Sequence, residues 1–207
     1  MSAYLGRRLF VLGSAACLTQ FTLFRNAFAQ ALTPSSVPTV DTLTLTVVMD
    51  SSHDIFLRAP APKAVRIRRT PGVEDWRKTL HNQWGLSLAL ESKAGAETRR
   101  MLLDFGYQPD TLQDNLQMLK VDLSKLDAMV LSHGHFDHFG GLVELLRKNR
   151  AALRQDLTLY VGGEENFCIR KRRTPTPGHF ADWGTLDRRE VVEQRVNLVA
   201  CEKPLVM

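Results

Sequence analysis

The segment LSHGHFDHFGGL, residues 131–142, contains three of the six histidines in the chain. His133 and His135 are two residues apart, directly after the apolar run AMVL, and Asp137 and His138 follow at once. In extended backbone, residues i and i+2 point to the same side, so two imidazoles can reach one ion. A carboxylate and an imidazole at the following turn can face a second ion. The segment therefore predicts a metal-binding loop that connects a buried strand to a helix.

The donor atoms of this loop indicate which metal it binds. Imidazole nitrogen and carboxylate oxygen suit zinc first, with iron or manganese as alternatives. We expect one or two ions, because two metals roughly 3.5–4 Å apart can clamp a reacting oxygen. A surface loop with histidines placed by chance is the competing interpretation, and the crowding of three histidines and an aspartate within six residues disfavours it.

The hydrophobic pattern around the loop predicts a mixed α/β fold. Residues 109–122 change to helical spacing, with Leu112, Leu116 and Leu119 on one face, and Asp110 and Gln113 match a capping box. The expected strands lie in 41–50, 85–92, 99–106, 125–133, 157–162 and 195–201, and the expected helices in 109–122 and 140–150.

The quoted motifs resemble a known family. HGHFDH matches the His-x-His-x-Asp-His motif of the metallo-β-lactamase superfamily, and MLLDFG is similar to its strand-end Asp-x-Gly motif. DLSKLDAMVLSHGHFDHFGGL and HNQWGLSLALES resemble the subgroup that includes dihydropterin–ribofuranosylaminobenzene phosphate synthase. The resemblance covers roughly residues 41–207 and implies an αβ/βα sandwich.

The resemblance also implies a role for each residue of the motifs. His133 and His135 would bind the first metal, and Asp137 and His138 the second. Asp137 would also orient the attacking hydroxide or handle its proton. Asp104 would orient the metal loop by hydrogen bonding, although an aspartate that caps a strand end is the simpler alternative.

The function implied by this resemblance is a metal-dependent hydrolase. A metal-bound hydroxide would attack an ester, a phosphoester or a related bond of a small-molecule substrate. One alternative is a synthase-type transferase of the dihydropterin subgroup. The other is a truncated, non-catalytic remnant that binds metal weakly.

The superfamily pattern requires further ligands: a third histidine, a bridging acid and a late histidine. Of the residues after His138, only His179 is a histidine, and it lies in a proline-rich segment. We therefore expect His179, with His81, to line the substrate rim, and His53 to be a chance polar position. The domain is expected to be incomplete, with only the N-terminal half to two-thirds of the sandwich and an exposed apolar sheet face.

The N-terminus has the layout of an export signal. Arg7 and Arg8 precede an apolar run, and small residues then offer A-x-A cleavage sites at 27–31. We expect a signal peptide over 1–31, of twin-arginine type, a linker over 32–40, and a periplasmic or secreted mature domain over 41–207. The apolar run is too short for a stable membrane anchor.

The charge and the cysteines limit the partners. The chain has a net charge of +5, but the signal segment carries three arginines and no acid, which leaves 24 basic against 22 acidic residues. A mature charge of +2 does not indicate nucleic acid. Cys168 and Cys201 remain after cleavage, and the sequence leaves open whether they pair, as it does the oligomeric state.

Overall fold

The computed structural model describes residues 38–51, 60, 62–63 and 79–205 of the 207-residue chain. The expected signal peptide and His53 lie outside the described residues. The described residues from Val40 onward form one compact unit.

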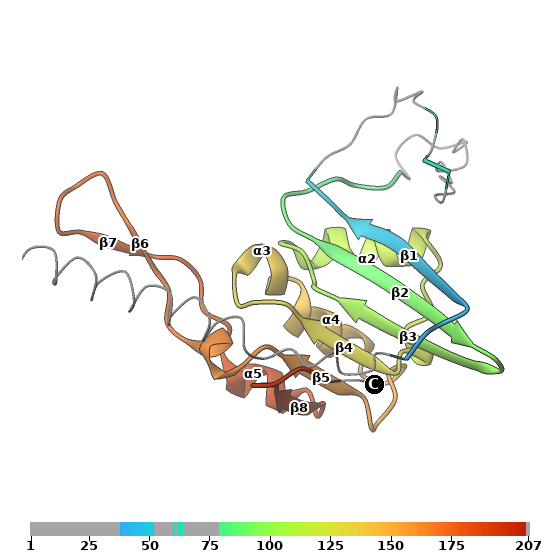
Figure 1. Cartoon of the computed structure of the whole chain (residues 1–207). Helices are drawn as coiled ribbons and strands as arrows, with labels where there is room; N and C mark the ends of the chain where they lie inside the picture. The colour runs from blue at the N-terminus through green and yellow to red at the C-terminus, as the bar shows by residue number, and fades with distance from the viewer. Residues whose placement is uncertain (1–37, 52–59, 61, 64–78, 206–207) are drawn as a thin grey trace, which may run out of the picture. The chain divides into compact units, whose positions relative to one another are not determined.

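The main feature of this unit is a six-stranded sheet with the order β1-β2-β3-β4-β5-β8 (Figure 1). β1 and β2 are antiparallel, as are β2 and β3, whereas β3, β4, β5 and β8 run parallel. The parallel strands therefore bring their carboxyl ends to one edge of the sheet, which we call the site edge. The strands span Thr42–Met49 (β1), Ser87–Ala94 (β2), Glu97–Leu103 (β3), Ala128–Leu131 (β4), Thr158–Val161 (β5) and Asn197–Ala200 (β8).

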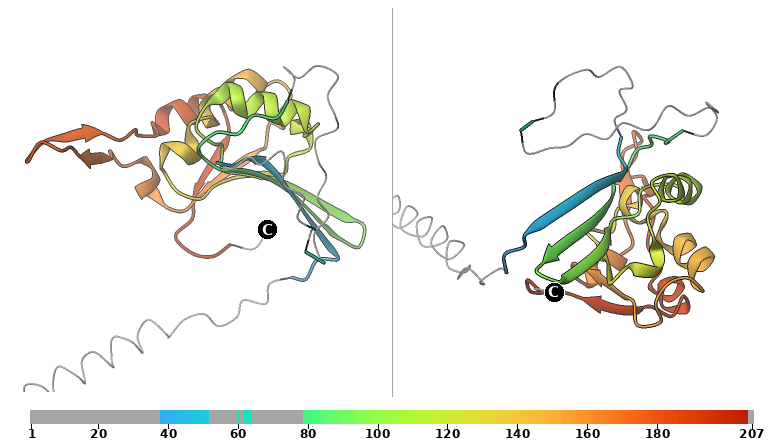
Figure 2. Two further views of the ribbon diagram at one scale, coloured as in Figure 1. Left: turned by 90° about the horizontal axis from the view of Figure 1, so that it is seen from above. Right: turned by 90° about the vertical axis from the view of Figure 1, so that its right-hand side faces the viewer.

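Helices α2 (Pro109–Met118), α4 (Leu142–Asn149) and α5 (Arg188–Glu193) connect the parallel strands and cover one face of the sheet (Figure 2). The apolar residues of α4 recur at i, i+3 and i+4, so Leu142, Leu145 and Leu146 all enter the core. They meet Met129 and Leu159 of the central strands, which are fully buried. The mixed α/β prediction is confirmed.

The opposite face of the sheet is apolar and open. Ala89 and its partner Leu102 contribute to the core, so the alternating Leu90 and Met101 point to the other side. Leu45 pairs with Leu90 on that side and is 51% exposed. The described residues thus provide one helical layer and one sheet layer, and the exposed apolar face expected from the sequence is present.

The capping box predicted at Asp110 and Gln113 is wrong. Helix α2 begins at Pro109 with Gln108 as its N-cap, and no side chain caps it. Asp110 lies inside the first turn and pairs with Lys148 of α4 at 3.0 Å. The helix ends at Met118, before the expected 122, because Lys120 adopts a left-handed backbone.

Six of the described elements were not expected from the sequence. They are the short helices α3 (Phe136–Phe139) and α5, the 3-10 helices η1 (Leu123–Lys125) and η2 (Glu164–Phe167), and the strands β6 (Lys171–Arg173) and β7 (Phe180–Asp182). β6 and β7 form a separate two-stranded hairpin that projects from the rest of the unit (Figure 1). Each of its strands is only three residues long, and β6 consists entirely of basic residues, so neither shows a recognisable strand pattern.

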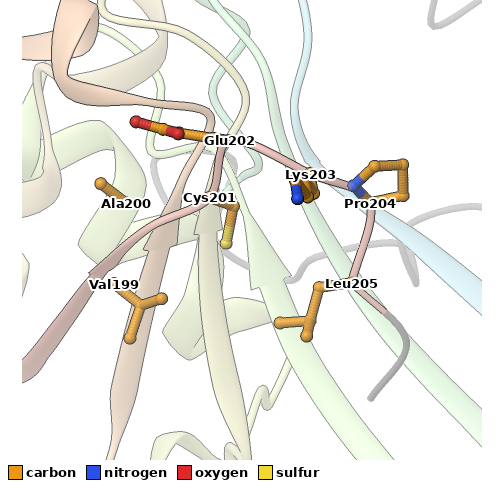
Figure 3. Close-up of a pocket in the computed structure, with 7 residues that line it drawn as sticks. All are labelled: Val199, Ala200, Cys201, Glu202, Lys203, Pro204 and Leu205. Atoms are coloured by element: carbon orange, nitrogen blue, oxygen red, sulfur yellow. The ribbon is translucent and has the colours of Figure 1, made fainter.

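Beyond β8 the chain turns back across the sheet (Figure 3). Residues 199–205 line a cavity of about 360 Å³ there. Cys201 lies at this cavity, Cys168 is exposed near the hairpin, and both thiols are free in the described structure. Within the described ranges, no helix has the length and apolar character needed to cross a bilayer.

Candidate metal centre

The histidine loop leaves the sheet at the site edge. Strand β4 ends at Leu131, Ser132 and His133 follow, and His135 is the N-cap of α3 in extended backbone. Phe136–Phe139 then form a single helical turn. The sequence order strand, metal-type loop and helix is therefore present, with one additional turn of helix inside the loop.

His133 and His135 form the first donor pair. His133 Nε2 lies 3.0 Å from His135 Nδ1, and the two rings are nearly perpendicular at 80°. This is the juxtaposition expected from residues i and i+2 of an extended segment. Two nitrogen atoms that point at the same small volume are suited to share one cation.

Asp137 and His138 form the second donor pair. Asp137 Oδ2 lies 3.5 Å from His138 Nε2. The His138 ring lies beside that of His133, with their centroids 4.1 Å apart. The two pairs are therefore adjacent, as a two-ion arrangement requires.

Asp104 anchors this arrangement from strand β3. Its side chain is 1% exposed, and its Oδ2 lies 2.7 Å from His138 Nδ1. It also accepts hydrogen bonds from the backbone N–H and the hydroxyl of Ser132, both at 2.7 Å. With His138 Nδ1 bound in this way, the Nε2 atom is the one left to bind a metal.

The backbone of Asp104 is also unusual. Its φ is +58°, a left-handed conformation that aspartate and asparagine tolerate better than most residues. Its N–H donates to Val130 O at 2.9 Å, which joins the end of β3 to β4. Asp104 thus ends its strand and also contacts the loop, so the two alternatives given for it are not exclusive.

The environment of His133 favours a neutral ring. Burial lowers its pKa, and the neighbouring imidazoles of His138 and His135 lower it further, whereas Asp104 and Asp137 act in the opposite direction. The net pKa lies below the ordinary value for histidine. A neutral imidazole has a free lone pair, which is the form that binds a metal.

The donor types fit zinc, but the number of donors falls short. A catalytic zinc site has three protein ligands and a structural site four. In the described ranges, no group of three or more His, Cys, Asp or Glu side chains is arranged to hold one ion. The loop provides two adjacent pairs, each of which supplies two donors.

The end of β5 supports the loop from the neighbouring strand. A side chain at Gly134 would overlap Asn166 O, so only glycine permits this approach. Gly162, the first residue after β5, lies beside Ser132, and a Cβ there would sit 3.4 Å from Ser132 O. The site edge is thus formed by residues that follow β3, β4 and β5.

His81 and His179 lie elsewhere in the structure. The backbone of His81 is held by Asn115, through bonds of 2.8 and 2.7 Å, while the residue itself is exposed. His179 is exposed at the turn of the β6–β7 hairpin. No hydrogen bond or ring contact among the described residues joins either side chain to the histidine loop, so their role at a substrate rim stays a prediction.

Ser132 contributes to the site but was not expected from the sequence. Its hydroxyl lies 2.7 Å from Asp104 Oδ2 and 3.0 Å from His133 Nδ1. It therefore links the residue that ends β3 to the first donor pair. The only available signal was its position, directly between the buried strand and His133.

Part of the chain is similar in sequence to known proteins. The family model of the metallo-beta-lactamase superfamily matches residues 94–155. A 7,8-dihydropterin-6-methyl-4-(beta-D-ribofuranosyl)-aminobenzene-5'-phosphate synthase of Methanocaldococcus jannaschii is 31% identical over 67 residues, which cover 32% of this chain and 23% of that protein. A UPF0173 metal-dependent hydrolase of Staphylococcus aureus is 49% identical over 35 residues, which cover 17% of this chain and 15% of that protein. The chain thus spans less than a quarter of the length of these relatives.

Solved structures give partial matches. MEM-A1, a subclass B3 metallo-beta-lactamase from a soil metagenome library, matches with 19% identity and a TM-score of 0.34, over 60% of this chain and 43% of that one. The metallo-beta-lactamase SMB-1 matches with 16% identity and a TM-score of 0.35, over 60% and 44%. The family match over residues 94–155, which include Asp104 and the histidine loop, confirms the resemblance deduced from the motifs.

Proposed function

We propose that this protein is a metal-dependent hydrolase that acts on an ester, a phosphoester or a related bond of a small molecule. The observation that carries the proposal is the pair of adjacent donor sets, His133 with His135 and Asp137 with His138, at the carboxyl ends of parallel strands. Zinc is the favoured metal, and iron and manganese are alternatives.

The described residues support this chemistry in separate ways. A bound divalent ion lowers the pKa of water and polarises a substrate oxygen. Asp104 holds His138 in one ring orientation, with Nε2 turned toward Asp137. The partly exposed Asp137 carboxylate is placed to orient a water or to accept its proton.

Two other functions have specific support. The M. jannaschii relative is named as a synthase, which favours a transferase. The two-donor limit of each pair favours a remnant that binds metal weakly. Retention of metal on dialysis, together with ester turnover, separates the hydrolase from both.

The test combines metal content with turnover. The purified chain is loaded with zinc, dialysed and analysed for metal, and nitrophenyl esters and phosphoesters are assayed with and without a chelator. We expect one to two ions per chain, rates that the chelator abolishes, and loss of both in His135→Ala. His179→Ala is the matched control and should keep its metal. A wild-type chain that releases all its zinc on dialysis contradicts the proposal.

The export signal leads to a separate proposal, that the protein works in the periplasm or outside the cell. It rests on Arg7, Arg8 and the A-x-A sites of the sequence. N-terminal sequencing of the protein recovered from fractionated cells should find a start near residue 30 or 32. A chain that stays intact in the cytoplasm would contradict it.

A further inference from the structure

An aromatic cluster surrounds the short helix α3, next to the histidine loop. It consists of Trp84, Tyr107, Phe136 and Trp183. Phe136 lies between the donor residues His135 and Asp137, and its ring contacts the other three at centroid distances of 5.2, 5.2 and 5.4 Å. Such tilted and edge-to-face contacts are favourable, so the rings hold one another in place.

The backbone connects this cluster to the donor residues. Leu86 N–H, two residues after Trp84, donates to Asp137 O at 3.2 Å. Phe105 N–H, two residues before Tyr107, donates to His138 O at 2.6 Å. Gly85 has no side chain where a Cβ would overlap Asp137 O. The aromatic cluster is therefore fixed to the backbone that carries the second donor pair.

The aromatic cluster is open to solvent. Trp84 is 51% exposed and Tyr107 is 39% exposed, so faces and edges of large rings remain uncovered. Tyr107, Phe136 and Trp183 also line a cavity of about 280 Å³, together with Arg172, Asp182 and Gly184. This solvent-open hollow combines three aromatic rings with two charged side chains, and aromatic walls with a few polar groups are typical of small-molecule sites.

The charged residues of the cavity indicate the kind of ligand. The Arg172 guanidinium lies 5.6 Å from the centre of the Trp183 ring, a cation–π contact. Within the described part of the chain, Arg172 forms no salt bridge, so its N–H groups are free for an anion. Asp182 instead accepts the N–H of Gly184 at 3.0 Å.

We propose that the aromatic cluster and Arg172 form the substrate-recognition subsite of this protein, for a planar aromatic ring that bears an anionic group. The ring packs against Trp183 and Tyr107, which line the cavity, and Arg172 pairs with the anionic group. That this ligand is a substrate rests on the proposed hydrolase function, since the subsite would place a bond of the bound molecule next to the histidine loop. Its binding chemistry, however, requires no metal.

The test measures binding without metal. 2-Naphthalenesulfonate and cyclohexanesulfonate, which share the anionic group and differ in the ring, are titrated by calorimetry into the full chain in the presence of a chelator. We expect the naphthalene compound to bind about tenfold more tightly, and Trp183→Ala to remove about that factor. Arg172→Gln should weaken binding of 2-naphthalenesulfonate but leave that of neutral 2-methoxynaphthalene unchanged.

Phe180→Ala provides the matched control. Phe180 belongs to the same hairpin and is 60% exposed, but it makes no ring contact with the aromatic cluster. The Phe180→Ala variant should bind both sulfonates as the wild type does, and circular dichroism checks that each variant is folded. Equal affinity for the two sulfonates, or equal losses in Trp183→Ala and Phe180→Ala, would overturn the inference. The titrations contain no metal. A protein that has no hydrolase activity but still prefers the naphthalene compound would therefore contradict only the hydrolase proposal.

Discussion

Oδ2 of Asp104 lies 2.7 Å from Nδ1 of His138, although 34 positions separate the two residues in the sequence. The buried carboxylate is placed to accept the Nδ1 proton, so in a neutral ring the free lone pair is on Nε2, the atom that faces Asp137. The end of β3 thus decides which nitrogen of His138 can bind a cation.

This relationship predicts the behaviour of Asp104→Asn. The amide tolerates the left-handed backbone and still accepts from Ser132, so the fold should persist. Its NH₂ group, however, would donate to His138 Nδ1 and move the ring proton to Nε2. We expect zinc affinity to fall by about 10- to 100-fold, measured by competition with a chromogenic chelator. An unchanged affinity would show that Asp104 does not set the tautomer of His138.

Ser132→Ala should have a smaller effect. The substitution removes the hydroxyl contacts with Asp104 and His133 but keeps the backbone bond to Asp104 Oδ1. We expect a decrease in zinc affinity of less than about 10-fold, because the loop keeps one of its two anchors. Ser124, whose hydroxyl bonds Asp122 far from the loop, offers a matched Ser→Ala control. A loss equal to that of Asp104→Asn would contradict this ranking.

The lowered pKa of His133 predicts the pH dependence of the metal-free protein. Because burial and the neighbouring imidazoles disfavour the charged ring, the unfolded chain binds the proton more tightly than the folded one. The stability contributed by neutral His133 is therefore complete above the unfolded pKa and is lost as the pH falls through the folded pKa. NMR titration of the His133 ring should give a pKa below the ordinary value for histidine, and a value at or above it would contradict the burial argument.

The covered and open faces of the sheet predict different losses of stability when a leucine side chain is shortened to alanine. Leu146 of α4 is fully buried, so Leu146→Ala should cost about 2–5 kcal/mol in the free energy of unfolding. Leu45 of β1 is 51% exposed on the open face, so Leu45→Ala should change it by about 0.5 kcal/mol or less. Urea denaturation measures both. Similar losses would mean that the open face is covered in solution.

Elements with a local signal were predictable from the sequence. The run Ala128–Leu131 is strand β4 at the expected residues, because four apolar residues between polar ones suit a strand buried in a parallel sheet. The helix expected within 140–150 is α4, and its Leu142, Leu145 and Leu146 face the core, since helical spacing decides which face is buried. The proximity of His133 and His135 follows from i and i+2 spacing in the same way.

Features that depend on contacts between distant segments were not predictable. The capping box was wrong because Pro109 already occupies the first helical position, and Asp110 pairs with α4 instead. The aromatic cluster combines three segments in which an aromatic residue adjoins a glycine: Trp84-Gly85, Gly106-Tyr107 and Trp183-Gly184. That repeated pairing was a signal, but only the fold shows that all three segments meet at Phe136.

The parallel order of β4 and β5 has a consequence for how a third donor could arise. Gly162 follows β5 at the same edge as Ser132, and a side chain there would begin at ordinary contact distance from its neighbours. One substitution, Gly162→His, would thus introduce an imidazole on the strand next to the two donor pairs. The sheet geometry makes this edge a place where coordination number can be engineered a residue at a time, with no change to the strands beneath it.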